Sequence, residues 1–236
     1  MEKRKWHNSD IQTSLLGFGA MRFVTKDGKV VEDLALDLID YAYKNGVNYF
    51  DTAAPYLGGQ SEIVLGKALK RYPRDSFYLA DKLTTQMLES GDKVLEFIKK
   101  QLHALQTDYI DFYLLHAMGR ERFEYVQQNK IMEQLEEAKS MGLIRNIGFS
   151  FHDDYDAFKW ILDSYLWDFC QIQLNYMDQD IQQGIKGYYD LLSRNIPVVI
   201  MEPIKGGKLA KFHERAEEIL TKKEPNKSIA SWAMRW

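Results

Sequence analysis

Short apolar segments with strand character recur along this chain, and most of them end at a polar residue. Seven can be read from the sequence: 13–18, 47–51, 77–82, 110–116, 144–150, 169–175 and 197–201. Segments with helical spacing of apolar residues lie between them, so one strand and one helix take roughly 25 to 35 residues together, as in β/α units. This spacing predicts an α/β fold whose strands lie parallel in one sheet.

The polar residues at the strand ends distinguish a closed barrel from an open sheet, which periodicity alone does not. They are Asp51, Lys82, His116, Ser150, Asn175 and Glu202. A barrel gathers the C-terminal ends of its strands at one mouth, whereas an open doubly wound sheet spreads them along an edge. We therefore expect a (β/α)8 TIM barrel with these side chains around one rim.

Composition limits the classes of partner. The 236 residues suit one domain, residues 1–236, and 45% hydrophobic with 28% charged residues is typical of a soluble globular protein. A formal net charge of −3 gives no reason to expect nucleic acid or an acidic membrane as partner. No segment reads as a signal peptide or a membrane span, so the cytoplasm is the expected location.

Cysteine and histidine usage argues against a metal centre. Cys170 is the single cysteine, so no internal disulfide or cysteine-ligated cluster is expected, and its apolar surroundings predict a buried thiol. The five histidines show no ligand spacing, so a catalytic metal is not expected. The glycines of 17–22 and 66–67 complete neither a dinucleotide fingerprint nor a phosphate-binding loop.

Four residues form a constellation with chemical meaning. Asp51 ends one strand-like run, Tyr56 follows it on a loop, and Lys82 and His116 end the next two runs. Taken singly, each has an ordinary explanation as a loop tyrosine, a buried histidine or a structural ion pair. Their order and their flanks, in the phrases NYFDTAAPY, DYIDFYLLH, IRNIGFS and MEPIKGGKLA, resemble the aldo-keto reductase family along most of the chain.

The resemblance implies an oxidoreductase that transfers hydride between a nicotinamide cofactor, NADPH or NADH, and a small carbonyl or alcohol substrate. A tyrosine with a pKa of about 10 is a poor acid near neutrality. The Lys82 ammonium would favour the phenolate of Tyr56, the general acid, and Asp51 would hold Lys82. His116 would orient the substrate oxygen. The alternatives are a nucleotide-binding sensor or regulatory module with little turnover, and a catalytically silent structural fragment.

Further residues are assigned to the cofactor by the same resemblance. Ser150 and Gln171 match positions that hold the nicotinamide carboxamide, Asn175 would lie near them, and Met201 stands where many members have an aromatic ring. The loop that follows contains Pro203, Gly206, Gly207 and Lys208. Its small residues would let the backbone approach a pyrophosphate, or they form a simple turn. His152 replaces a common asparagine and is either a substitute donor or a loop residue.

The resemblance also concerns the two ends of the chain. It implies that a hairpin in residues 3–12 closes the bottom of the barrel. The segment 228–236 resembles the helix before the eighth strand, so we expect about seven strands and a barrel that is incomplete at its C-terminus. The phrases FSFHD and MEPIKGGKLA look most like a branch whose longer members carry an iron–sulfur region. The cysteines of such a cluster are not in this sequence, so it is implied only for a longer parent protein.

Overall fold

A curled parallel sheet of seven strands forms the centre of the computed structural model, which describes residues 1–7 and 9–236. Each strand pairs in parallel with its neighbours in the order β11-β10-β9-β8-β7-β6-β3. The strands are β3 (Phe18–Gly19), β6 (Tyr49–Asp51), β7 (Tyr78–Leu83), β8 (Ile110–Met118), β9 (Ile144–Phe151), β10 (Phe169–Gln173) and β11 (Val198–Met201). Among the described residues β3 and β11 do not pair with each other, so the α/β sheet is an open barrel with two edges.

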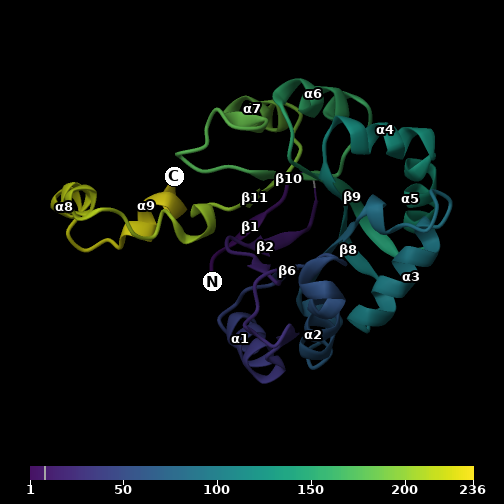
Figure 1. Cartoon of the computed structure of the whole chain (residues 1–236), viewed down its shortest axis with the longest axis horizontal. Helices are drawn as coiled ribbons and strands as arrows, with labels where there is room; N and C mark the ends of the chain where they lie inside the picture. Colours follow the sequence, from purple (N-terminus) through teal and green to yellow (C-terminus); the bar gives the residue numbers. More distant parts are fainter. Residues whose placement is uncertain (8) are drawn as a thin grey trace.

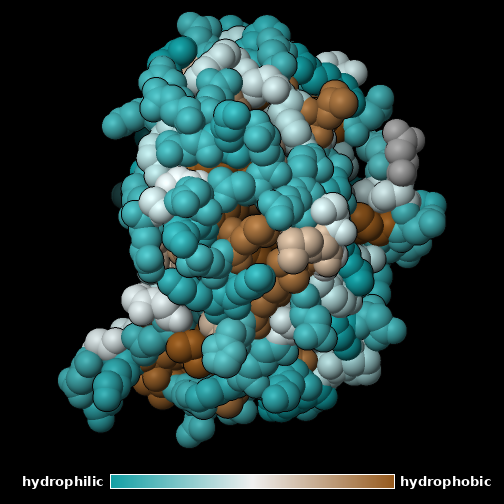
Figure 2. Space-filling view, turned by 90° about the vertical axis from the view of Figure 1, so that its right-hand side faces the viewer, coloured by the Kyte–Doolittle hydropathy of each residue, from teal (hydrophilic) through white to brown (hydrophobic). Residues whose placement is uncertain are grey.

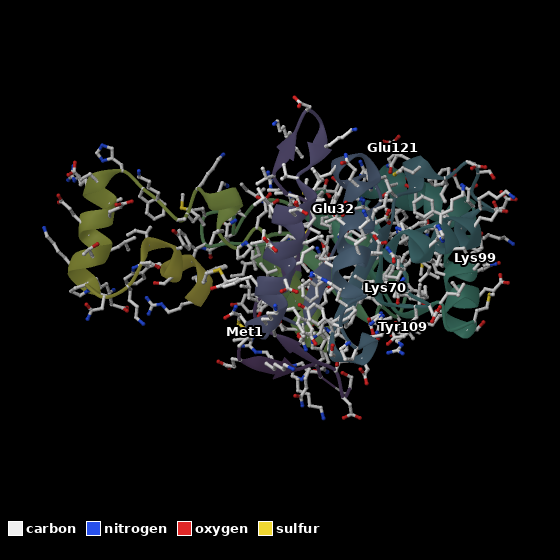
Figure 3. All side chains as sticks on the ribbon, turned by 90° about the horizontal axis from the view of Figure 1, so that it is seen from below. Met1, Glu32, Lys70, Lys99, Tyr109 and Glu121 are labelled. Carbon is white, nitrogen blue, oxygen red and sulfur yellow. The ribbon has the colours of Figure 1, made fainter. Side chains whose placement is uncertain are left out.

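Helices lie outside the sheet (Figure 1). They are α1 (Glu32–Lys44), α2 (Gln60–Leu69), α3 (Val94–Leu105), α4 (Arg120–Gln128), α5 (Ile131–Ser140), α6 (Tyr155–Asp163) and α7 (Gly184–Ser193). Two more helices, α8 (Glu214–Lys223) and α9 (Ile229–Arg235), follow β11 and extend away from the ring of helices, as Figures 1 and 3 show from two directions.

The main core lies between the sheet and its helices. Central strands are buried on both faces, which explains why β8 reads as an almost continuous apolar run. Figure 2 shows that the outer face around the helices is mostly hydrophilic, with a band of hydrophobic residues across its middle. No helix of the described part of the chain is both long and apolar enough to cross a membrane.

A small N-terminal hairpin closes the barrel at the N-terminal ends of its strands. Strand β1 (Lys3–Lys5) pairs antiparallel with β2 (Gln12–Ser14), and the ring of Trp6 lies 4.5 Å from that of Phe112 between ring centroids. Trp6 packs against an interior cluster that also contains Phe169. The hairpin expected within residues 3–12 is therefore present, and its second strand extends slightly beyond that range.

Two details of the sequence prediction were wrong. The expected first strand 13–18 is divided, because Gln12–Ser14 belongs to the hairpin and only Phe18–Gly19 joins the sheet. In α1, Leu34 and Leu38 were expected on the apolar face but are 53% and 50% exposed, while Ala35 and Ile39 are buried. Helix α1 packs on α2, and no other described helix makes comparable contacts with it.

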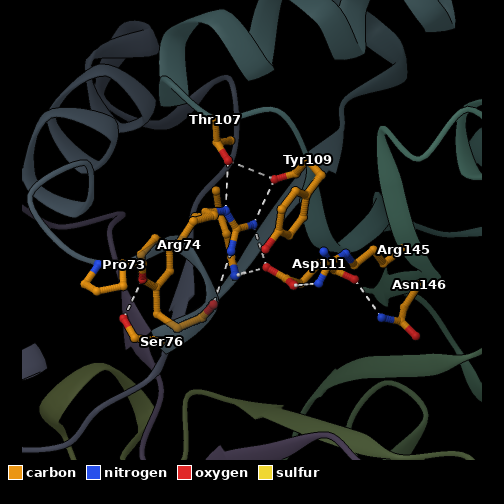
Figure 4. A network of polar contacts seen from close by, with 10 residues as sticks. Pro73, Arg74, Ser76, Thr107, Tyr109, Asp111, Arg145 and Asn146 are labelled. Atoms are coloured by element: carbon orange, nitrogen blue, oxygen red, sulfur yellow. Dashed lines mark hydrogen bonds and ion pairs between the residues drawn. The ribbon is translucent and has the colours of Figure 1, made fainter.

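A cluster of charged and aromatic residues ties three strands together near their N-terminal ends (Figure 4). The buried Asp111 carboxylate accepts hydrogen bonds from Arg74 at 2.6 Å, from Arg145 at 3.3 Å and from the Leu79 main-chain N–H at 2.9 Å. The Tyr109 ring lies between the two guanidinium groups, whose Cζ atoms are 3.8 Å and 3.5 Å from its centroid. This end of a barrel usually serves stability rather than chemistry.

Candidate active site

Lys82 and Asp51 form a buried ion pair at the C-terminal ends of β7 and β6. The Lys82 side chain is 1% exposed, and its ammonium donates to Asp51 Oδ1 at 2.6 Å and to the Thr52 main-chain oxygen at 2.6 Å. Burial lowers the pKa of Lys82, but Asp51, Tyr56 and Asp81 together outweigh burial, with Asp51 contributing most, so the pKa lies above its ordinary value. Lys82 therefore remains an ammonium at neutral pH.

Tyr56 reaches the same rim from a loop. It opens the short 3₁₀ helix η1 (Tyr56–Gly59), in which Leu57 has a φ of 53° and is held in the left-handed region. The Lys82 Nζ atom lies 5.2 Å from the centroid of the Tyr56 ring. Burial raises the pKa of Tyr56, and the Lys82 ammonium opposes this rise without cancelling it. The phenol therefore stays protonated at neutral pH, which is the form that donates a proton.

His116 faces Tyr56 from β8. The two rings lie 5.8 Å apart between centroids at an interplanar angle of 78°. Burial first, and then the positive charge of Lys82, lowers the pKa of His116 to about 3, so its imidazole is neutral. The Thr84 hydroxyl lies 2.7 Å from His116 Nδ1. If Thr84 donates that bond, Nε2 carries the hydrogen and can donate to a substrate oxygen.

His116 lies within an irregularity of β8. The register shifts between Leu115 and Met118, and Ala117 has a φ of 52°, a backbone region that non-glycine residues rarely adopt. The Ala117 N–H donates to the Ser150 hydroxyl at 2.7 Å. The sequence analysis did not predict Thr84 or the bulge in β8, because neither changes the spacing of apolar residues along the chain.

Two of the expected cofactor residues lie side by side. Ser150 on β9 and Gln171 on β10 are register partners, and both are buried. The Gln171 Oε1 atom is buried without a hydrogen-bond partner within the described residues. A buried polar atom of this kind fits an incoming donor such as a carboxamide. These two residues therefore suit the nicotinamide group that the sequence resemblance implies.

Asn175 does not offer a free amide. Its Nδ2 donates to Asp178 Oδ2 at 2.9 Å and to the Glu202 main-chain oxygen at 3.3 Å, while its Oδ1 accepts from the Met177 N–H at 3.0 Å. Asn175 therefore shapes the turn after β10 and holds it to the end of β11. It was expected near the nicotinamide, and its contacts are those of a supporting residue.

The loop after β11 has the open backbone expected of it. Met201 ends the strand and is partly buried, and Pro203 follows after one residue. Gly206 and Gly207 have φ of 61° and 94°, and an added Cβ at either would meet nothing within 4 Å. The Lys205 ammonium pairs with the Asp178 carboxylate, which ties this loop to the turn after β10. The described geometry is compatible with both interpretations, a phosphate approach and a simple turn.

The remaining candidates have simpler positions. His152 follows β9 and is exposed as a whole residue, but partial burial of its imidazole lowers its pKa. Its charge is among the influences on His116. Cys170 is buried, as expected, and burial raises the pKa of its thiol well above the ordinary value. Over residues 1–7 and 9–236 there is no group of three or more His, Cys, Asp or Glu side chains that could hold a metal ion.

A parallel β/α sheet with a tyrosine, a lysine, an aspartate and a histidine at its C-terminal rim defines a barrel-type oxidoreductase. The chain belongs to the aldo/keto reductase family, whose family model matches residues 15–235.

Relatives and solved structures agree with this assignment. Over 159 residues the chain is 34% identical to the Uncharacterized oxidoreductase YqkF of Bacillus subtilis (strain 168), a match that covers 64% of this chain and 49% of that protein. Over 218 residues it is 29% identical to L-galactose dehydrogenase of Arabidopsis thaliana, with 89% of this chain and 67% of that protein covered. The matches thus span about half to two thirds of these relatives. The holo form of aldo-keto reductase AKR11C1 from Bacillus halodurans superimposes with a TM-score of 0.80 at 28% identity, covering 99% of this chain and 81% of that one.

Proposed function

We propose that this chain is an NAD(P)H-dependent reductase of small carbonyl compounds, or acts on the corresponding alcohols in reverse, with Tyr56 as the general acid. The observation that carries the proposal is the convergence of four side chains at one rim. The Lys82 ammonium lies 2.6 Å from Asp51 Oδ1 and 5.2 Å from the Tyr56 ring centroid, and the His116 ring lies 5.8 Å from that of Tyr56.

Each residue has one task in the proposed reaction. Tyr56 gives its phenolic proton to the carbonyl oxygen as negative charge develops there. The Lys82 ammonium stabilises the phenolate that remains, and Asp51 keeps Lys82 charged and oriented. Neutral His116 donates a hydrogen bond from Nε2 to the same oxygen, while Thr84 holds its Nδ1. The neutral imidazole matters because a second cation would disturb the balance of charge around the phenol.

The residues present fit a nicotinamide cofactor, which supplies the hydride when bound, because no side chain of this site can do so. Gln171 has a buried oxygen without a partner, and Ser150 is its register partner on the neighbouring strand. Met201 offers a polarisable thioether for packing, and the loop 203–207 offers open glycine backbone. Either NADPH or NADH is compatible with these residues.

The relatives suggest the chemical class of the substrate. L-galactose dehydrogenase carries in its name the oxidation of a sugar, and YqkF is named an oxidoreductase. The proposal accordingly includes small polar aldehydes and their alcohols, handled in the cytoplasm without nucleic-acid or membrane partners.

The test combines binding with turnover. Reduced nicotinamide cofactors are titrated by fluorescence, and their oxidation is then followed with a panel of aldehydes and ketones. We expect binding, turnover, and a loss of kcat of about 10² to 10⁴ in Tyr56→Phe with cofactor affinity retained, as befits a lost general acid. Tyr41→Phe, at an exposed position of α1, is the matched control. Binding without any turnover, or full activity in Tyr56→Phe, would refute the proposal.

A further inference from the structure

A second carboxylate lies directly beside the candidate catalytic lysine in the sequence, on the opposite face of its strand. Asp81 points away from the barrel interior towards the helices, and it is 0% exposed. Across the layer it meets Glu62 of α2, which is also buried. The mechanism proposed above uses neither residue, and two buried carboxyl groups in contact are costly unless they share a proton.

The main-chain hydrogen bonds between β6 and β7 end just before Lys82. The last hydrogen bond between β6 and β7 runs from the Thr52 N–H to the Ala80 oxygen at 3.0 Å. Beyond it, the Thr52 oxygen accepts from the Lys82 ammonium instead of a main-chain N–H. The N–H and C=O of one strand residue point to the same side, so both main-chain groups of Lys82 have lost their partner on β6.

Two side chains supply the hydrogen bonds that β6 no longer makes with the Lys82 main chain. The Lys82 N–H donates to Asp81 Oδ1 at 2.8 Å, and the Lys82 C=O accepts from Gln101 Nε2 at 3.0 Å. Gln101 Nε2 also donates to Glu62 Oε1 at 3.0 Å, and the Tyr113 hydroxyl donates to Gln101 Oε1 at 2.6 Å, which fixes the orientation of the amide. Among the residues that the structure describes, the hydrogen bonds to the Lys82 main chain beyond the ladder thus come from this buried cluster.

The charges of the cluster follow from its contacts. Burial, followed by the nearby Glu62 carboxylate, raises the pKa of Asp81 well above its ordinary value. Burial also raises the pKa of Glu62, but hydrogen bonds with Asp81 and Gln101 act in the opposite direction. Both pKa values are raised because the two carboxyl groups are buried side by side, so the pair holds one proton between them at neutral pH. Tyr113 faces the pair as a neutral phenol, because burial raises its pKa.

We propose that Asp81, Glu62 and Gln101 are positioning residues that clamp the main chain of Lys82 through one proton shared between two buried carboxyl groups. If these side chains only filled the space between the sheet and the helices, they would not need to bond both the N–H and the C=O of Lys82. The consequence for the reaction rests on the proposed function, because it assumes that Lys82 tunes Tyr56. A misplacement of about 1 Å at a reacting group can cost about a hundredfold in rate.

The experiment compares Asp81→Ala with Asp81→Asn. Asparagine mimics the protonated acid, since its amide oxygen can accept from the Lys82 N–H and its amide nitrogen can donate to Glu62. We expect hydrogen exchange of the Lys82 amide to be roughly five to ten times faster in Asp81→Ala, as for one lost hydrogen bond, and close to wild type in Asp81→Asn. The kcat should fall about tenfold to a hundredfold in Asp81→Ala and be largely restored by Asp81→Asn. Gln101→Leu should lower kcat in the same way.

A direct measurement of the proton keeps the proposal falsifiable if Asp81→Ala does not fold. The infrared spectrum of the wild type should contain a protonated carboxylic acid band at neutral pH that Asp81→Asn lacks. Asp111→Ala is the matched control, since it removes a buried carboxylate from the neighbouring strand at the opposite end of the barrel.

The outcomes separate the two proposals. No acid band, unchanged amide exchange in Asp81→Ala, or an equal loss of kcat in Asp81→Ala and Asp111→Ala would overturn the clamp. Absence of turnover in the wild type would instead overturn the proposed function, and the infrared and exchange measurements would still decide whether the clamp exists.

Discussion

The Asp51 carboxylate accepts a hydrogen bond of 2.6 Å from the Lys82 ammonium, and this contact opposes the lowering of the Lys82 pKa by burial. Removing one partner of a buried ion pair typically costs about 3 to 5 kcal/mol. We predict that Asp51→Ala lowers the free energy of unfolding by an amount of this order, measured by urea denaturation. Glu32→Ala, which breaks an exposed pair with Lys67, should cost less than about 1 kcal/mol. Equal losses in the two variants would contradict the prediction.

The same pair predicts a loss of stability at alkaline pH. The folded chain keeps the Lys82 proton to a higher pH than the unfolded chain does, because the folded pKa is raised above the ordinary 10.5. The contribution is therefore complete below pH 10.5 and is lost as the pH rises through the folded value. Urea midpoints measured from neutral to alkaline pH should fall more steeply in the wild type than in Lys82→Met. A parallel decline in both would show that other groups, such as the buried tyrosines, account for it.

The lowered pKa of His116 should make the stability of the fold decrease at acid pH. Burial lowers its pKa from 6.5 to about 3, so between these pH values the unfolded chain binds a proton at His116 and the folded chain does not. Stability therefore falls as the pH drops from 6.5 towards 3, by at most roughly 4 to 5 kcal/mol from this residue. His116→Gln should flatten this part of the profile. In the wild type, kcat should show no step near pH 6.5, and such a step removed by His116→Gln would refute the neutral imidazole.

Replacing Asp111 should lower the stability of the fold without lowering kcat. It is buried between Arg74 and Arg145 at the end of the barrel away from Tyr56. We expect Asp111→Asn to lower the free energy of unfolding by about 2 to 3 kcal/mol, somewhat less than for a fully buried pair because the guanidinium groups reach solvent. The exposed Asp75→Asn is the control. The kcat of the folded variant should be that of the wild type, and a large fall would mean that this end is linked to the site.

The sequence alone could predict those features that depend on neighbouring residues in the chain, and not those that depend on contacts with other elements. Strand ends are local, since an apolar run stops at a polar residue, and Asp51, Lys82 and His116 were placed at one rim on that basis. The buried face of α1 is not local, because Leu34 and Leu38 fit the helical spacing as well as Ile39 does, and only the neighbouring elements decide which side is covered.

The supporting residues of the site could not be predicted for a related reason. Gln101 and Thr84 act on Lys82 and His116 from other elements of the chain, so nothing in their own flanks indicates these contacts. Asp81 stands beside a strand lysine in the sequence, and because neighbouring strand residues point to opposite faces of a sheet it lies on the face towards the helices. Its explanation required Glu62, which comes from α2.

Gln171 gives a prediction in which binding and stability change in opposite directions. Its Oε1 atom is buried without a partner among the residues described, so it carries a desolvation cost that only an incoming donor relieves. Gln171→Leu should therefore leave the free energy of unfolding unchanged or raise it by about 1 kcal/mol, while weakening cofactor binding by roughly two- to tenfold, the value of one hydrogen bond. Gln183→Leu is a demanding control, because Gln183 also has a buried amide oxygen without a partner but donates from Nε2 to the Gln173 main chain at 2.7 Å. That variant should lose stability and keep cofactor affinity. Fluorescence titration and urea denaturation of both variants would check the prediction, and unchanged affinity in Gln171→Leu would remove this residue from the cofactor site.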